Sequence, residues 1–424
     1  MTNVGETSVP TSTGPLAAHR AQSILVLEHL VDHGSATRSE LATATGLGRG
    51  AIAGLTARLI DAGVLRPAET DPTGDGRATP LSLSAADHVL VTTMIGPDEA
   101  IATVASLSGE ELARFSAPLA GSDTERPDPD ASSVGAPGTG DALDALGISL
   151  ARALARAQRS GHPVADVTVL VDGIVAGAPS VVITDARFGA EPVDVIGELR
   201  ARVPALVEAE ATLLLPITLE PATAAAAAAE RAELPGVADL VYLTGDTGVS
   251  AAIISGGIAL QGAHGLASTF GHLPVVENGV RCECGQRGCL VTVASPEVVL
   301  ERAGLADFAV THGRAAAIDE LVLRVDEAED RARWSWLDAA LRIGRALQFV
   351  LPTVDPAIVV VGGYWGRLVG DIDTAYRANR PTLAGGALEA VPAITPARLG
   401  ADAPLLGARH QARQRLVAGP LLIG

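Results

Sequence analysis

The sequence contains no lysine, so all 31 basic residues in its 424 are arginines. A Walker A lysine and a Schiff-base mechanism are therefore excluded. Aromatic residues make up only 3% of the chain, so its cores must be built mainly from Ala, Val, Leu and Ile. The most apolar stretch, residues 167–183, is interrupted by Asp172 and two glycines and is too short to span a bilayer. We therefore expect no membrane partner.

Positive charge is also in deficit, because the net charge is -18. This balance opposes non-specific attraction to nucleic acid over the molecule as a whole. The N-terminus lacks the charged segment and apolar run of a signal peptide. Together with cysteines expected to stay reduced, this favours a cytoplasmic location. A chain of this length is expected to form two or three domains.

Cysteine is scarce, and its three copies all lie in one segment, "GHLPVVENGVRCECGQRGC", residues 271–289. One histidine and three thiolates at this spacing match a tetrahedral structural zinc site, which leaves no open position for water. The alternatives are buried inert thiols or one disulfide with a cysteine left over; the odd count argues against a disulfide framework. We expect one structural Zn²⁺ per chain. The predicted ligands are His272, Cys282, Cys284 and Cys289.

Residues 17–84 have the pattern of a winged helix-turn-helix. A helix ends at Gly34, a second opens with Thr37 and Glu40 at capping-box spacing, and a third ends at Gly63. Two short strands then flank the turn "TDPTGDGR". This order is typical of a DNA-docking unit, and a plain three-helix bundle is the alternative. Residues 1–16, rich in Thr, Ser, Gly and Pro, are expected to be a disordered tail.

From Val89 onward, apolar runs alternate with helical stretches, which predicts an α/β fold. The predicted helices are 141–160, 222–233, 296–303 and 331–350. Residues 120–141 are rich in Pro, Gly, Asp and Ser and are expected to be a flexible surface insert.

The winged helix, the α/β body and the cysteine cluster together resemble the ROK family of repressors, open reading frames and kinases. The most specific motif is "GHLPVVENGVRCECGQRGCL", supported by "GDTGVSAAIISGGIALQGAHGLASTFGH" and "VDPAIVVVGG". The resemblance implies two actin-like α/β lobes around a cleft, where a sugar and ATP meet in the family's kinases. Lobe 1 is then expected at 85–209, completed by a C-terminal helix at 401–424. Lobe 2 is expected at 210–400, with the zinc loop at 272–289.

The resemblance also implies that the kinase residues are lost. Met94 stands where the kinases carry the aspartate of their phosphate-contacting turn, and Pro97 replaces a glycine amide there. The catalytic base position is occupied by Ala222. Glu220 lies two positions away, about 6–7 Å along a strand, whereas a base must lie within about 3 Å of its proton. We therefore expect no enzyme activity.

Sugar recognition is altered as well. Thr269 and Val291 stand where the family carries sugar-binding glutamates, and Asp172 replaces a proline. A remaining sugar-effector site would involve Gly173, Thr269 and His272. Family members bind nucleotide at glycine turns that match positions of this chain, although such glycines also make strand-to-helix turns. These glycines are Gly245, Gly248, Gly362 and Gly363.

At the DNA-binding end, the front of the third helix should enter the major groove. Arg49 is its only base-reading polar side chain, and such a contact to guanine contributes about 1–3 kcal/mol. Small residues beside it can offer apolar contacts: Gly50, Ala51 and Ala53. Phosphate contacts are expected from Arg38, Arg58, Arg66 and, in the wing, Arg77.

The sequence thus favours a DNA-binding regulator that acts as a repressor. We expect it to read a palindromic double-stranded operator as a homodimer or homotetramer and to sense a sugar or sugar derivative. A degenerate family member that acts through protein contacts or an unknown ligand is the alternative. An active sugar kinase is less favoured.

Overall fold

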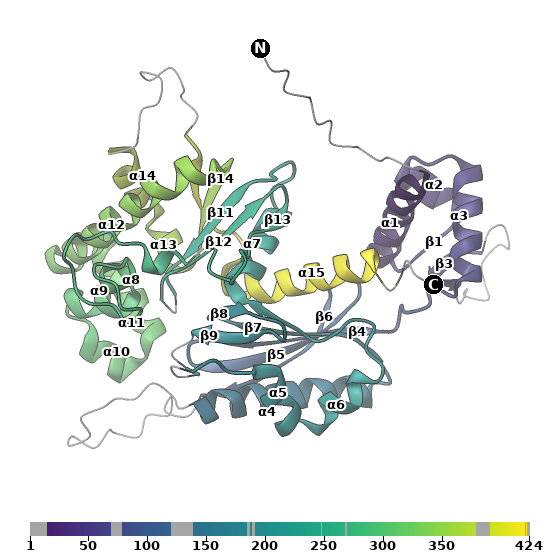
Figure 1. Cartoon of the computed structure of the whole chain (residues 1–424), viewed down its shortest axis with the longest axis horizontal. Coiled ribbons are helices and arrows are strands. Elements are labelled where there is room, and N and C mark those ends of the chain that lie inside the picture. Colours follow the sequence, from purple (N-terminus) through teal and green to yellow (C-terminus); the bar gives the residue numbers. More distant parts are fainter. Residues whose placement is uncertain are drawn as a thin grey trace, which may run out of the picture.

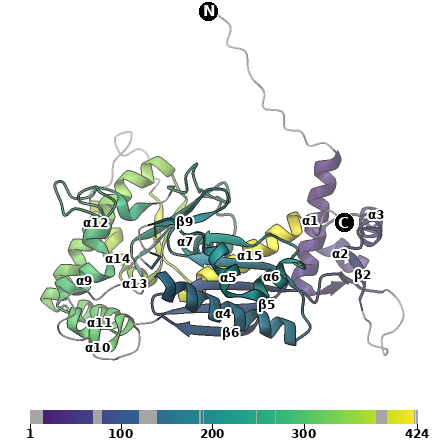
Figure 2. The ribbon, with the colours of Figure 1, turned by 60° about the horizontal axis from the view of Figure 1, so that its bottom comes forward.

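The computed structural model describes residues 15–68, 79–119, 139–184, 187–188, 191–246, 248–267, 269–378, 391–419 and 421. These residues form an N-terminal winged helix and an α/β body with two five-stranded sheets (Figure 1). The helix α15 (Ala403–Ala418) runs from between the sheets to the winged helix (Figures 1 and 2). No helix in the described ranges has the length and apolar character needed to cross a bilayer.

The winged helix has the predicted element order. Thr37 and Glu40 form the predicted capping box at the start of its second helix, and Gly46 and Gly63 follow helix ends with positive φ. Three short strands pair in the order β1-β3-β2. Its elements are α1 (Pro15–His33), β1 (Ser35–Ala36), α2 (Arg38–Thr45), α3 (Arg49–Asp61), β2 (Leu65–Pro67) and β3 (Leu81–Leu83). Helix α1 begins inside the segment expected to be a tail.

The first lobe is built on a sheet in the order β10-β7-β4-β5-β6. Strands β4, β5 and β6 are antiparallel, whereas β7 and β10 run parallel to β4. The strands are β4 (Val89–Ile95), β5 (Glu99–Ser106), β6 (Glu111–Pro118), β7 (Val164–Val171) and β10 (Thr218–Pro221). Helix α4 (Thr139–Arg159) covers one face with α5 (Val195–Arg202) and α6 (Pro204–Glu210), and α15 packs on the other (Figure 1). A hairpin of β8 (Ile174–Ala176) and β9 (Val181–Thr184) follows β7.

The second lobe has a sheet in the order β13-β12-β11-β14-β15. Its strands are β11 (Leu240–Thr244), β12 (Ser250–Ser255), β13 (Ile258–Ala259), β14 (Ile358–Val361) and β15 (Ala393–Pro396). Side chains alternate along β11: Leu240 and Tyr242 pack toward α7 (Ala222–Ala232), while Val241 and Leu243 face the larger core. Helices on that second side are α8 (Val291–Ala294), α9 (Pro296–Ala303), α10 (Ala306–His312), α11 (Arg314–Asp326), α12 (Asp330–Val354), α13 (Gly363–Arg367) and α14 (Val369–Ala378).

Helices α7 and α15 join the lobes through small residues. A Cβ added at Gly407 would overlap the backbone of Ala225, so only glycine permits this approach. Further along α15, Ala412 and Leu416 pack into the core of the winged helix. Thus α15 contacts both lobes and the DNA-binding unit.

Two sequence-based segments need correction. The insert expected at 120–141 ends earlier, because α4 already begins at Thr139; residues 120–138 lie outside the described ranges. One of the apolar runs that follow Val89, residues 211–219, is a strand only in its last part, β10. Pro216 has no backbone N–H to donate to a sheet, which explains the irregular start.

Candidate functional site

The structure brings the four predicted zinc ligands together. The ligand atoms of His272, Cys282, Cys284 and Cys289 all lie within 4.8 Å of one another. The Nδ1 atom of His272 is 3.6 Å from the Sγ atom of Cys282, and the Sγ atoms of Cys284 and Cys289 are also 3.6 Å apart. Tetrahedral bonds of about 2.1 Å to nitrogen and about 2.3 Å to sulfur give edges of about 3.6–3.8 Å. The donor set and its spacing therefore fit one Zn²⁺.

A tight loop creates this geometry. The backbone N–H of Cys282 donates to the carbonyl of Gln286 at 2.8 Å, and Gly285 and Gly288 both have positive φ. A Cβ at Gly288 would overlap the carbonyl of Val276, so glycine is required there. Because the chain reverses direction in this loop, Cys282 and Cys289, which are seven positions apart, can direct their sulfur atoms toward the same metal position.

Burial shifts the pKa of two of these four groups in the absence of a cation. It lowers the pKa of His272, which favours the neutral imidazole that binds metals. Burial also raises the pKa of the Cys289 thiol. A bound cation would offset this cost by stabilising the thiolate.

The kinase positions lie in an apolar cluster. Met94, at the end of β4, and Ala222, at the start of α7, are 9% and 3% exposed, respectively, and pack in one buried group. The other members of this group are Leu170, Ala225, Leu405 and Ala408. Among these residues no side chain can accept a proton from a sugar hydroxyl.

Glu220 is held away from the role of a replacement base. Its carboxylate accepts a 2.7 Å hydrogen bond from Arg415 of α15. The same guanidinium lies 3.3 Å from the buried carboxylate of Asp166, which also accepts from Thr168. Burial raises the pKa of both carboxyl groups, and the guanidinium opposes that rise. This network was not predicted, because its members come from three distant segments.

The turn that resembles a phosphate loop is closed by an arginine. Gly96 donates its N–H to the carbonyl of Glu99, which makes a tight hairpin between β4 and β5. Arg187 donates to the carbonyls of Ile95 and Gly96 and forms a 3.0 Å ion pair with Asp172. Sequence reasoning missed Arg187 because no local pattern marks it.

The glycines that resemble nucleotide-binding turns have packing roles. Cβ atoms at Gly245, Gly362 and Gly363 would overlap Trp365, Tyr242 and Asp246, respectively. The Asp246 carboxylate also accepts the N–H of Tyr364. A carboxylate beside both turns opposes the approach of a phosphate. A Cβ at Gly248 would meet open space, but its φ of +154° is a backbone conformation that side chains rarely adopt.

The predicted sugar side of the cleft spans both lobes. Gly173 lies between β7 and β8, and a Cβ at Gly265 would overlap the carbonyl of Val175 in β8. The loop before Thr269 therefore packs against the hairpin that follows Gly173. The hydroxyl of Thr269 donates to the carbonyl of Leu266 at 3.0 Å. Val291 begins α8.

The winged helix presents the predicted face of α3 to solvent. Ile52, Leu55, Thr56 and Leu59 are buried, whereas the residues predicted to contact bases are exposed: Arg49, Gly50, Ala51 and Ala53. Arg58 is also exposed.

Two of the predicted phosphate-contacting arginines also have internal partners. Arg38 donates from Nε to the hydroxyl of Thr56 at 3.0 Å, which ties α2 to α3. Arg66 pairs with Asp87 at 2.9 Å. Arg77 lies outside the described residues.

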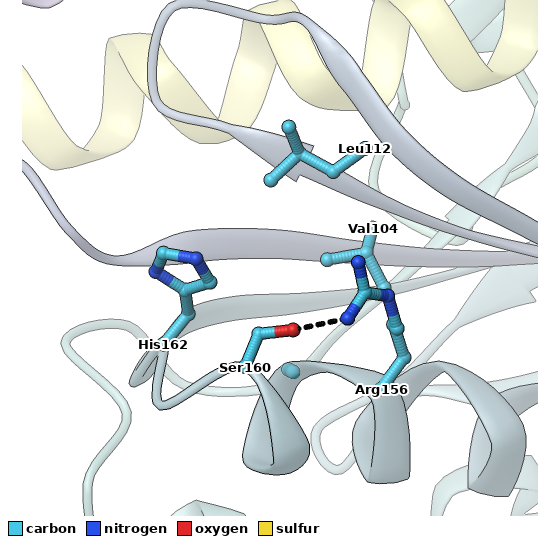
Figure 3. A pocket seen from close by; sticks show the side chains of 6 residues that line it. Val104, Leu112, Arg156, Ser160 and His162 are labelled. Atoms are coloured by element: carbon cyan, nitrogen blue, oxygen red, sulfur yellow. Dashed lines mark hydrogen bonds between the residues drawn. The ribbon is translucent and has the colours of Figure 1, made fainter.

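A pocket lies beside the C-terminal end of α4, against strands β5 and β6 of the first sheet (Figure 3). The guanidinium of Arg156 donates a hydrogen bond to the hydroxyl of Ser160 at this pocket. The pocket is lined by Val104, Leu112, Arg156, Ala157, Ser160 and His162. None of the predicted site residues lines it.

Comparison with known proteins relates this chain to a sequence family. The sequence profile described as "ROK family" matches residues 137–415. N-acetylmannosamine kinase from Escherichia coli (strain SE11) is 32% identical over 174 residues, which are 40% of this chain and 57% of the relative. The chain thus spans little more than half the length of the curated relatives it matches.

Solved structures agree with the profile. A ROK family transcriptional regulator, a homologue of the E. coli MLC protein, superimposes with a TM-score of 0.69 at 21% identity over 95% of this chain and 98% of that chain. A ROK family glucokinase from Streptomyces griseus, solved with glucose and AMPPNP, superimposes with a TM-score of 0.58 at 24% identity. The match covers 77% of this chain and 99% of that chain. The regulator match includes the N-terminal region, so the predicted architecture of a winged helix and an actin-like sugar-kinase fold is confirmed. The chain belongs to the ROK family.

Proposed function

We propose that this protein is a DNA-binding transcriptional regulator, acting as a repressor, whose kinase-like body has lost catalysis and serves in effector sensing and oligomerisation. The observation that carries the proposal is the winged helix with an exposed α3, packed through α15 onto a body whose catalytic positions are apolar. The regulator similar in structure supports this assignment.

DNA reading is assigned to the exposed front of α3. Arg49 reads a base edge, and Gly50, Ala51 and Ala53 allow close approach to the groove. Arg38, Arg58 and Arg77 contact phosphates. Because one polar group discriminates weakly, two chains on a palindromic double-stranded operator are needed for specificity.

The proposed loss of sugar phosphorylation rests on the residues at the kinase positions. Transfer of a phosphoryl group to a sugar hydroxyl needs a base close enough to take the hydroxyl proton. It also needs hydrogen-bond donors that hold the phosphate. Here the base position is Ala222, in an apolar cluster with Met94, and Glu220 is paired with Arg415. Because a relative is named as an N-acetylmannosamine kinase, sugar kinase activity is the alternative, and an ATP-dependent phosphorylation assay tests it.

The zinc centre is assigned a structural role. Four protein ligands saturate a tetrahedral Zn²⁺, so His272, Cys282, Cys284 and Cys289 would hold it without an open position. The ion would fix the loop 272–289, which leads directly into α8.

A sugar or sugar-derivative effector is assigned to the cleft between the lobes. Gly173 and Thr269 come from the two sides that meet at Val175 and Gly265. Since α15 passes from this region to the winged helix, a change in lobe closure has a physical route to the DNA-binding unit.

A second candidate is a family member without specific DNA binding. The net charge of -18 and the single polar side chain at the front of α3 favour it. Electrophoretic mobility shifts with DNA from upstream of the protein's own gene, followed by selection of bound sequences with and without sugars, separate the two. Recovery of no enriched sequence would reject the regulator.

A further inference from the structure

Helix α12 exposes a stripe of large apolar side chains. Trp334, Leu337, Leu341 and Phe349 are 64%, 39%, 44% and 54% exposed, respectively. At helical spacing they lie on one face, which we name the α12 stripe. In a chain with 3% aromatics, two aromatic residues on one solvent-facing stripe are unexpected. Contiguous exposed apolar surface of this kind is typical of an interface.

The opposite face of α12 is already occupied. Ala332, Trp336, Ile343 and Leu347 are buried in the core of the second lobe. Helices α9, α11 and α14 pack against α12. Among the described residues, therefore, the core accounts for the buried face and leaves the α12 stripe without an explanation.

Two pairs of residues on the exposed face of α12 are placed symmetrically along the helix. Trp334 and Phe349 are equally distant from the point between Leu341 and Arg342, and so are Asp338 and Arg345. If two copies of α12 pair antiparallel about a two-fold axis at that point, each Trp334 meets a Phe349 and each Asp338 meets an Arg345. An isologous interface requires this type of symmetry, and offset or edge-to-face aromatic pairs add to the gain from apolar burial.

The charged pair is compatible with this arrangement. Arg345 is exposed and forms no ion pair with another described residue. Asp338 pairs with Arg302 at 2.9 Å and with Arg342 at 3.4 Å in its own chain, and its side chain keeps 23% exposure. The carboxylate can therefore accept a further contact from outside.

We infer that the α12 stripe is the surface on which a second copy of this chain docks, through antiparallel two-fold pairing of α12. Helix α12 lies at the end of the body away from the winged helix (Figures 1 and 2), so this pairing leaves both α3 helices uncovered. The inference deepens the proposed function, on which its biological use rests, because it supplies the second DNA-binding unit.

The test uses the full chain and measures mass by sedimentation velocity over a concentration series. Wild-type protein is expected to exceed the 42.9 kDa of one chain by at least a factor of two. Trp334→Glu and Leu341→Arg should reduce the mass by half or more, with unchanged circular dichroism because both sites are exposed. Ile258→Glu, at an exposed apolar site on β13, is the matched control and should leave the mass unchanged.

A cross-linking arm tests the axis itself. Leu341→Cys places a thiol beside its own counterpart near the two-fold axis, so mild oxidation should join two chains. Val207→Cys, exposed on α6, should not. A wild-type chain that stays monomeric, a dimer that survives Leu341→Arg, or equal cross-linking of the two cysteine variants would overturn the inference.

Failure of the proposed function gives a different result. If the variants dissociate the pair but wild-type protein selects no DNA sequence, the α12 stripe stands and the regulator is rejected. If wild-type protein selects an operator while the stripe variants keep their mass, the regulator stands and the two-fold pairing is wrong.

Discussion

Met94 and Ala222, which come from different elements far apart in the chain, pack together in one buried apolar cluster. The resemblance assigns to these positions two carboxylates of the kinases, one at the phosphate turn and one as the base. Leu405 and Ala408 of α15 complete the cluster. The two positions are therefore spatially coupled, because a carboxylate at either one would be surrounded by the apolar side chains of this cluster, which cannot pair with it.

Ala222→Asp is expected to destabilise the protein without restoring sugar phosphorylation. An unpaired carboxyl group at a site 3% exposed costs about 1–3 kcal/mol or raises its own pKa to stay neutral. Thermal unfolding and an ATP-coupled assay with glucose, N-acetylglucosamine and N-acetylmannosamine measure both effects. Ala232→Asp, exposed on the same helix, is the control. Protein-dependent turnover in either wild type or Ala222→Asp would contradict the loss of catalysis.

Cys284→Ser is expected to lower zinc content and thermal stability together. Metal binding at a site formed only in the folded chain contributes directly to folding free energy. Metal analysis and thermal unfolding measure the two quantities in the same samples. Glu283→Ser alters the exposed residue between two ligands and should change neither. Native protein without zinc, or a Cys284→Ser variant that melts like wild type, would refute the assignment.

Glu111 is expected to contribute pH-dependent stability. Ion pairs with Arg114 and Arg409 lower the pKa of Glu111 to about 2. Because the folded-state pKa is depressed, the contribution is complete above the unfolded value of 4.5 and is lost as pH falls from there toward 2. With allowance for partial solvent screening it amounts to about 1–3 kcal/mol.

Urea unfolding at pH 7 and pH 3.5 should show that Glu111→Gln costs more stability at the higher pH. The exposed neighbour Glu110→Gln serves as the control. An equal loss at both values would mean that the ion pairs do not set this part of the pH dependence.

Local signals explain which parts of the fold were predictable. The capping box at Thr37, the glycines that end helices and the spacing of the predicted zinc ligands are all patterns within short segments. The structure has the capping box and the glycines as predicted and brings the four predicted ligands together. Strand β6 is not recognisable as an apolar run, because it is an edge strand whose side chains are mostly exposed and lack a clear apolar alternation.

The contacts around the cleft could not be predicted from local patterns. Arg187 reaches the end of β4, and Arg415 reaches β7 and β10, over long sequence separations. Nothing in the residues beside an arginine specifies such a partner. The resemblance located the positions that carry catalytic residues in the family's kinases, whereas only the three-dimensional packing shows what surrounds them here.

Arg49→Ala and Arg77→Ala are expected to affect DNA binding differently. Arg49 is the polar side chain at the exposed start of α3, so its loss should relax selectivity at one base position per half-site, at a cost of about 1–3 kcal/mol. Arg77→Ala should weaken binding to all sequences and reduce the salt dependence. Binding to selected and scrambled duplexes over a salt series measures both. Unchanged selectivity in Arg49→Ala would refute groove reading by α3.

The contact between α15 and α1 is expected to control how firmly the winged helix is held. Leu416 is 1% exposed and packs with Val26, Leu27 and Leu30 of α1, and Arg413 pairs with Asp32 of the same helix. Leu416→Ala should leave a cavity that costs about 2–5 kcal/mol in this contact. Hydrogen exchange in α1 should then accelerate, and affinity for the selected operator should fall because the two DNA-binding units are no longer held in register. Leu406→Ala removes the same side chain at a site of the same helix that is 36% exposed, and should leave exchange in α1 and operator affinity unchanged. If exchange accelerates while affinity stays at the wild-type level, the winged helix reads DNA independently of the body, and α15 does not couple the two.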